Sequence, residues 1–144
     1  MNNNPLTVMA FDYGLRQIGV AMGNSLLDTS QPLTVLMARD GTPRWDELEA
    51  LIAEWQPQLL VVGDPINMDG SDSKFSIKAR RFARRLHGRF GLPVELVDER
   101  LSSFEAKQES TERGHRGNYK QDPVDSIAAE LILRTWLAEG GRQA

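Results

Sequence analysis

The spacing of apolar residues along this chain changes repeatedly, and this change constrains the fold more than any other feature. Three β-type runs come first and are joined by short, turn-rich links, which predicts an antiparallel meander over residues 7–11, 17–22 and 32–38. A helical pattern follows from Thr42 to Trp55, in which Thr42 matches an N-cap and Pro43 matches the first helical position. The dense apolar run at 59–63 predicts a strand that is covered on both faces.

The second half of the chain continues with alternating helical and β-type patterns. Residues 74–90 combine a basic composition with an apolar stripe at helical spacing, and residues 93–97 form the fifth β-type run. A capping-box pattern at 102–105 opens a short helix, and the last helix extends from Asp122 to about Glu139. This order predicts an α/β fold in one domain over residues 1–144, with a mixed five-stranded sheet and helices on both faces. Ribonuclease-H-like domains use the same order of elements.

The composition restricts the chemistry that such a domain can perform. The 144 residues contain no cysteine and two histidines, which excludes disulfides, thiol nucleophiles and thiolate zinc sites. A metal ion would therefore be held by oxygen ligands, which favours Mg²⁺ or Mn²⁺. The N-terminus is polar and the chain has no apolar stretch of about 20 residues, so we expect a cytoplasmic protein without a signal peptide or a membrane partner. We also expect residues 1–5 to be disordered and residues 113–121 to form a mobile loop.

Acidic residues follow two of the predicted strands and begin the last helix. Asp12 ends the first strand, and Glu99 follows Asp98 at the end of the fifth, where ligands usually bind in α/β sheets. Asp125 lies in the first turn of the last helix, on the margin of its apolar face. Each acid alone also fits a turn, a solvated strand end or a helix-capping position. Together, Asp12, Glu99 and Asp125 would form a catalytic site whose carboxylates bind metal ions for phosphodiester hydrolysis.

Asp64 is a further candidate because it also ends a predicted strand, immediately before Pro65. The polar loop that follows, residues 67–71, could offer backbone N–H groups to a phosphate. The same residue types are also common in ordinary turns. The sequence therefore leaves two interpretations of this segment open.

Positive charge is concentrated at residues 74–89, although the formal net charge of the chain is −3. Seven lysines and arginines occur there without an intervening acid, and like charges four residues apart destabilise a helix. Contact with phosphates relieves that repulsion, so we predict nucleic-acid binding, although a solvated helix face has a similar composition. The residues predicted to contact nucleic acid are Lys74, Lys78, Arg81, Arg85, Arg100, Arg116 and Lys120.

Four sequence motifs occur in order across nearly the whole chain. They are Asp12-Tyr13-Gly14 with residues 18–21, Val61-Val62-Gly63 with residues 67–70, residues 98–102, and Val124-Asp125-Ser126 with Ala128-Ala129. They resemble the YqgF-type family, whose members are also described as Holliday junction resolvases or pre-16S rRNA nucleases. The resemblance implies a ribonuclease-H-like fold, a cytoplasmic location and a role in maturing the 5′ end of 16S rRNA.

The same resemblance places the family's acidic site on Asp12, Glu99 and Asp125. Two positions depart from the family pattern, since Gln17 replaces a basic residue and Asp64 replaces an apolar one. Resolvases of this fold carry an acid at the end of the fourth strand, so Asp64 is a possible extra ligand. Whether Asp64 or Glu99 completes the site stays open, and we favour Glu99.

Three functional hypotheses follow from these observations. The leading one is a metal-dependent endonuclease that processes the 5′ end of pre-16S rRNA during ribosome biogenesis. Its expected partner is the small ribosomal subunit, and its expected oligomeric state is a monomer or a weak dimer. The second is a Holliday junction resolvase that acts on branched DNA, for which two symmetric cuts predict a dimer. The third is a non-catalytic RNA- or ribosome-binding module, which would keep its function when Asp12 loses its charge.

Overall fold

A computed structural model describes residues 7–98 and 123–139 of the chain. Within these ranges, no helix is long and apolar enough to cross a membrane. Several predictions fall outside the described residues. They concern the N-terminal residues 1–5, the short helix at 102–105, the loop at 113–121, the N-cap at Asp122, and the side chains of Glu99, Arg100, Arg116 and Lys120.

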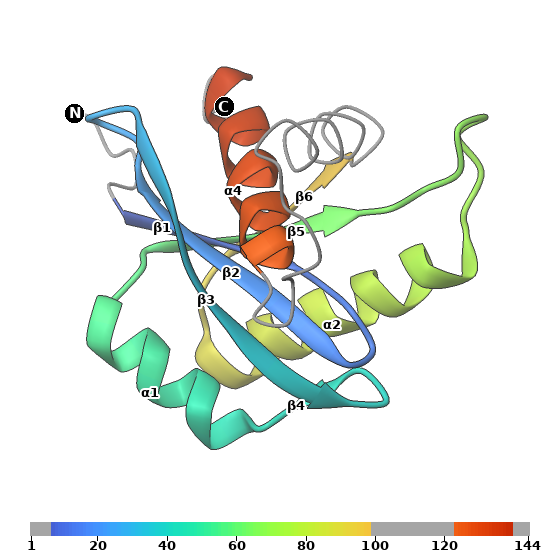
Figure 1. Cartoon of the computed structure of the whole chain (residues 1–144), viewed down its shortest axis with the longest axis horizontal. Helices are drawn as coiled ribbons and strands as arrows, with labels where there is room; N and C mark the ends of the chain where they lie inside the picture. The colour runs from blue at the N-terminus through green and yellow to red at the C-terminus, as the bar shows by residue number, and fades with distance from the viewer. Residues whose placement is uncertain (1–6, 99–122, 140–144) are drawn as a thin grey trace.

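The described residues form a six-stranded sheet with helices on both faces (Figure 1). The strand order is β4-β3-β2-β1-β5-β6. The first four of these strands are antiparallel neighbours, whereas β5 is parallel to both β1 and β6. The predicted meander and the predicted mixed sheet are therefore confirmed. The elements are β1 (Thr7–Asp12), β2 (Gln17–Asn24), β3 (Thr29–Arg39), β4 (Thr42–Pro43), α1 (Trp45–Trp55), β5 (Leu59–Asp64), α2 (Lys74–Phe90), β6 (Val94–Asp98) and α4 (Pro123–Ala138).

The short strand β4 is a correction to the predicted five-stranded sheet and to the predicted start of the first helix. Asp40 and Gly41 have φ angles of 52° and 82°, the left-handed conformation that a two-residue hairpin turn requires. The chain therefore folds back, and β4 pairs with the end of β3. Helix α1 begins only at Trp45, and its N-cap residue Arg44 makes no side-chain capping hydrogen bond. The prediction of Thr42 as N-cap was wrong because this residue belongs to the hairpin.

Alternate residues of the central strands pack on opposite faces of the sheet. In β1, Met9 and Phe11 belong to the core beneath α1 and α2, whereas Val8 and Ala10 belong to the core beneath α4. The same alternation holds in β5, where Leu60 and Val62 join the first core and Leu59 and Val61 join the second. The period of two residues thus assigns each strand position to one face.

Helix α2 presents its apolar stripe to the sheet as predicted, with Ala79, Phe82, Ala83 and Leu86 all buried. Its start is fixed by a capping box in which the backbone N–H groups of Ser76 and Ser73 donate to the hydroxyl of the other serine, at 2.9 and 3.0 Å. Because the apolar stripe is buried, the lysines and arginines of α2 are exposed, except for Arg80, which is half-buried.

Helix α4 covers the other face and lies close to the sheet (Figure 1). A Cβ atom at Gly23 of β2 would stand 2.7 Å from Leu133 Cδ2, so this position permits the close approach only because it lacks a side chain. The hydroxyl of Ser30 in β3 donates to Glu130 Oε2 of α4 at 3.0 Å. Packing and hydrogen bonding together fix the helix on the sheet.

Candidate functional site

Asp12 ends the central strand β1 on the face that α4 covers. The alternation of β1 assigns it to that face together with Val8 and Ala10. Its cross-strand partner is Gly19 of β2, which presents no side chain beside it. The carboxylate therefore stands at the carboxyl ends of the parallel strands, where a ligand can approach the sheet.

The other two acids predicted for this site are not described at the level of their side chains. Asp125 lies in the first turn of α4, and Ala129 and Ile132, four and seven residues later, are buried against the sheet. Glu99 follows the last residue of β6 in the sequence. Among the described residues, no group of three or more histidine or carboxylate side chains is positioned to hold a metal ion.

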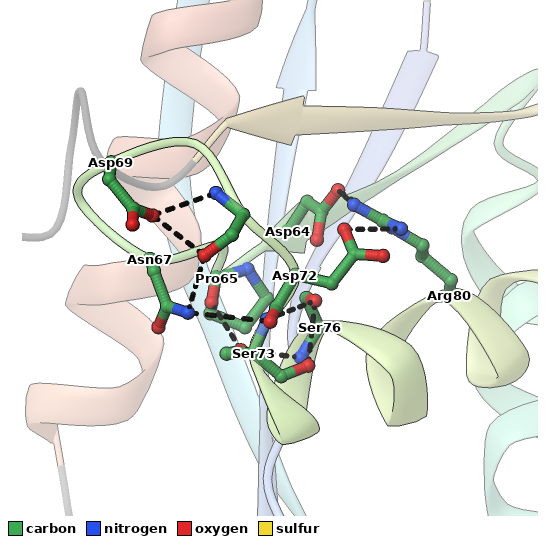
Figure 2. A network of polar contacts seen from close by, with 9 residues as sticks. Asp64, Pro65, Asn67, Asp69, Asp72, Ser73, Ser76 and Arg80 are labelled. Carbon is green, nitrogen blue, oxygen red and sulfur yellow. Dashed lines mark hydrogen bonds and ion pairs between the residues drawn. The ribbon is translucent and has the colours of Figure 1, made fainter.

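Asp64 ends the neighbouring strand β5 but faces the opposite side of the sheet. It is 8% exposed, and its Oδ2 accepts a hydrogen bond from Arg80 Nε at 3.0 Å. The same oxygen forms an ion pair with Arg80 Nη2, also at 3.0 Å. Arg80 also contacts Asp72 Oδ1 through Nη1 at 3.0 Å, so one guanidinium bridges two carboxylates (Figure 2). The hydrogen bond to Asp64 raises the pKa of Arg80 above its ordinary value, so the guanidinium keeps its charge. Asp64 Oδ1 is buried and has no hydrogen-bond partner among the described residues.

In the loop between β5 and α2, the N–H groups of Asn67, Gly70 and Ser71 donate to acceptors within the loop (Figure 2). The N–H of Asn67 donates to Ser71 O at 2.9 Å, and that of Gly70 donates to Asn67 O at 2.8 Å. The N–H of Ser71 donates to Asp69 Oδ1 at 2.9 Å, and the Ser73 hydroxyl donates to Pro65 O at 2.7 Å. These bonds favour the turn interpretation of residues 67–71 over the phosphate-binding one.

The predicted cationic contacts on α2 are brought together on its outer surface. Lys74, Lys78, Arg81 and Arg85 are all exposed. Arg89 lies over the ring of Trp45, with its guanidinium carbon 4.2 Å from the ring centroid. Lys74, Lys78, Arg81 and Arg85 are therefore available to a nucleic acid, and Arg84 is exposed as well.

Tyr13 was not among the predicted site residues, yet it lies between Asp12 and the basic helix. Its ring contacts Phe75 and Phe82, with centroid distances of 5.7 and 5.1 Å. Burial raises the pKa of its phenol, while the charges of Arg85 and Arg81 act in the opposite direction. The sequence shows that an aromatic residue follows Asp12, but the position of Tyr13 beside α2 depends on the pairing of distant strands.

The sequence matches the family model described as "RuvX: Holliday junction resolvase" over residues 6–139. The chain belongs to the RuvX family. This membership confirms the YqgF-type resemblance of its motifs. Proteins similar to this RuvX family member include one from Chromohalobacter salexigens, 56% identical over 132 residues, which are 92% of this chain and 89% of that protein. Another, from Azotobacter vinelandii, is 52% identical over 137 residues, which are 95% and 96% of the two chains. Both carry the name "Putative pre-16S rRNA nuclease".

Solved structures similar to this RuvX family member include resolvases. The structure of RuvC from T. thermophilus in complex with a Holliday junction substrate gives a TM-score of 0.53 at 13% identity, covering 94% of this chain and 96% of that one. The fowlpox virus resolvase in complex with Holliday junction DNA also gives 0.53, at 10% identity, covering 96% and 100%. Similarity at these identities establishes the fold, and it confirms the predicted ribonuclease-H-like class.

Proposed function

We propose that this protein is a metal-dependent endonuclease that processes the 5′ end of pre-16S rRNA in the cytoplasm. The names of its relatives support the RNA substrate. The observation that carries the proposal is the position of Asp12, which ends the central strand on the face that α4 covers. Asp125 belongs to the first turn of that helix in the sequence, which supports its inclusion in the proposed site. A carboxylate at this position can bind a cation or orient a water molecule.

The proposed acidic site consists of Asp12, Glu99 and Asp125 and does not include Asp64. In β6, Glu95 and Val97 both point toward α4. Glu99 follows Val97 by two residues in the sequence, which is the spacing of side chains on one face of a strand. Asp64 instead binds Arg80 on the other face of the sheet. Carboxylate oxygens are the donors that Mg²⁺ and Mn²⁺ prefer, so the donor set fits either ion. When bound, such an ion would supply an activated water and compensate the charge of the leaving oxygen.

The exposed cations of α2 would hold the nucleic-acid backbone in this proposal. Lys74, Lys78, Arg81 and Arg85 form one surface on the helix, and lysine and arginine contacts to phosphates supply affinity without sequence preference. Arg100, Arg116 and Lys120 remain proposed contacts. The small ribosomal subunit, which would present the RNA, is the proposed macromolecular partner of a monomer or weak dimer.

Cleavage of a 5′-extended 16S precursor RNA tests the proposal. Wild type is expected to cut it with Mn²⁺ or Mg²⁺ and to be inactive in EDTA, whereas Asp12→Asn is expected to be inactive throughout. Asp28→Asn makes the same charge change in the turn after β2, at the opposite end of the sheet, and serves as the matched control. Equal cleavage by Asp12→Asn and the control would refute the assignment of Asp12.

Metal binding has a readout that does not depend on activity. A ligand that binds only the folded state stabilises it by about 2.7 kcal/mol at 100 times its Kd. We therefore expect Mn²⁺ to raise the Tm of wild type and of Asp28→Asn, but to raise that of Asp12→Asn much less. Equal shifts in all three proteins would place the cation elsewhere.

A second candidate substrate is branched DNA, because the matching family model is described as a Holliday junction resolvase. A four-way DNA junction belongs in the same cleavage assay. Cleavage of the junction without cleavage of the RNA would select this substrate and predict a dimer. If the RNA is bound but neither substrate is cut, also after addition of small ribosomal subunits, the protein is a binding module.

A further inference from the structure

A small polar pocket lies on the α2 side of the sheet, beside the turn that follows Asp12. Its volume is about 110 Å³. One water molecule takes about 30 Å³ in the liquid, so the pocket holds roughly three to four water volumes, which is enough for one small group. The lining residues are Tyr13, Asp40, Gly41, Thr42, Lys78, Arg81, Phe82 and Arg85.

One wall of the pocket is cationic. Lys78, Arg81 and Arg85 are spaced three and four residues apart, so they project from the same face of α2. All three are exposed, and none forms an ion pair with the described residues. Arg80, in contrast, is held between two carboxylates. The wall thus offers three positive charges that no carboxylate of the described residues neutralises by direct contact.

The opposite wall consists of two turns that hold each other in place. The Tyr13 hydroxyl donates to Gly41 O at 3.2 Å, and the N–H of Gly41 donates to Leu15 O at 2.9 Å. A Cβ atom at Gly41 would collide with the Tyr13 hydroxyl, so this close packing requires glycine. Because the wall is fixed without a ligand, little conformational entropy would be lost on binding.

The charges and donors of the pocket fit a phosphate group. Its three cations outnumber the single acid Asp40, which leaves two net positive charges among the lining side chains. Thr42 adds a hydroxyl donor. A phosphate presents several strong acceptor oxygens, and charge-assisted hydrogen bonds to lysine and arginine are among the strongest available to it.

We propose that this pocket binds one phosphate group of the nucleic-acid backbone and thereby sets the register of the strand relative to Asp12. The inference rests on the proposed function and defines a phosphate subsite within the broader surface of α2. Tyr13 follows Asp12 directly but packs against α2, on the opposite side of the sheet. The phosphate held here is therefore a neighbour of the scissile phosphate and is not cleaved itself.

Binding of a single-stranded RNA oligonucleotide in EDTA tests the subsite without any catalytic step. Arg81→Gln and Arg85→Gln are each expected to weaken binding about tenfold and to lower the salt slope by about one. Arg84→Gln removes the same charge from the same helix outside the pocket, and it is expected to weaken binding by less than about threefold. Equal losses for Arg81→Gln and Arg84→Gln would overturn the proposal, because general attraction to α2 would then explain the binding.

Two substitutions on the opposite wall provide an independent test. Thr42→Val removes the hydroxyl without changing charge and is expected to weaken binding. Asp40→Asn removes the opposing carboxylate and is expected to strengthen binding, and asparagine tolerates the positive φ of this position. Unchanged affinity in both variants would contradict the proposed site.

Titration with inorganic phosphate distinguishes a backbone phosphate from a free anion. We expect saturable changes in the amide NMR resonances of Gly41 and Thr42, which disappear in Arg81→Gln. If these changes occur while the variants bind RNA as wild type does, the pocket serves a free phosphate compound and the proposal is wrong. If the pocket variants lose RNA binding but wild type cuts neither RNA nor DNA, the proposed catalytic function fails and the subsite stands.

Discussion

Trp136 of α4 donates its indole N–H to Glu95 Oε1 of β6 at 2.8 Å. The indole is 2% exposed, so this bond forms within the core between the helix and the edge strand of the sheet. It joins the C-terminal half of α4 to β6, while Ser30 joins the middle of the helix to β3. Together these bonds orient the helix whose first turn contains Asp125.

Glu95→Leu is expected to lower the free energy of unfolding by about 1–3 kcal/mol, because the Trp136 N–H would stay buried without an acceptor. Glu95→Gln keeps an acceptor oxygen and is expected to lower it by less than about 1 kcal/mol. Urea denaturation of both variants measures the difference. Equal losses would mean that the hydrogen bond does not hold the helix.

Arg80→Met is expected to lower the Tm because it leaves the buried carboxylate of Asp64 without its cation. The double variant Arg80→Met/Asp64→Leu removes both charges and is expected to recover part of that loss. Thermal unfolding of the two single variants and the double variant gives the coupling between the residues. Additive losses would show that the ion pair does not stabilise the fold.

Asp64→Asn is expected to retain metal-dependent cleavage, since Asp64 faces α2 and lies outside the proposed acidic site. The assay is the one used for Asp12→Asn, at a temperature well below the Tm of the variant. Circular dichroism confirms that the variant is folded. A loss as complete as that of Asp12→Asn would return Asp64 to the list of metal ligands.

Gly41→Ala and Gly88→Ala are expected to change stability in opposite directions. At Gly41 a Cβ atom would collide with the Tyr13 hydroxyl and φ is 82°, so we expect a loss of about 1–3 kcal/mol. At Gly88, within α2, a Cβ atom would meet no heavy atom within 4 Å, so alanine should stabilise the helix by about 0.5–1 kcal/mol. Chemical denaturation compares them, and the same sign for both would contradict the role assigned to Gly41.

The stability of the protein is expected to fall in alkaline solution through Tyr13, because burial raises the pKa of its phenol despite the opposing charges of Arg85 and Arg81. A group with a raised pKa in the folded state contributes stability below its unfolded pKa, about 10, and this contribution is lost as the pH rises through the folded pKa. Tyr13→Phe should therefore lose less stability than wild type above about pH 10.

Tyrosinate absorbance and denaturation at alkaline pH measure this effect. The absorbance of Tyr13→Phe serves as the baseline, because it retains the other tyrosine of the chain. Arg85→Gln is expected to raise the pKa of Tyr13 further, since it removes a charge that lowers it. Parallel stability curves for wild type and Tyr13→Phe would show that the phenol is not coupled to folding.

Most of the fold could be predicted because its elements carry strong local patterns. The apolar run of β5 indicated a strand covered on both faces, and its residues 59–64 are all buried. The apolar stripe of α2 indicated the face that packs on the sheet. The hairpin at Asp40-Gly41 was missed, although an Asp-Gly pair between extended segments is a signal for such a turn. The prediction instead followed the N-cap pattern at Thr42-Pro43.

The candidate site could be predicted only in part, because a sequence shows where a strand ends more readily than which way its last residue faces. Asp12 and Asp64 both end strands, but the continuous apolar run of β5 hides the alternation that directs Asp64 toward Arg80. The pocket beside Tyr13 was missed for a related reason. It depends on the register that brings Gly41 and Thr42 to the turn after β1, and that register is a long-range property.

The alternation of β1 also determines the path that a bound strand would follow. Asp12 and Tyr13 are adjacent in the chain, yet their side chains face opposite sides of the sheet. A backbone that reaches both must bend sharply around the end of β1. A stiff duplex resists such a bend, whereas a single-stranded leader or an opened branch point adopts it at little cost. At this edge of the molecule, the flexibility of the nucleic-acid backbone would thus select substrates without any contact to the bases.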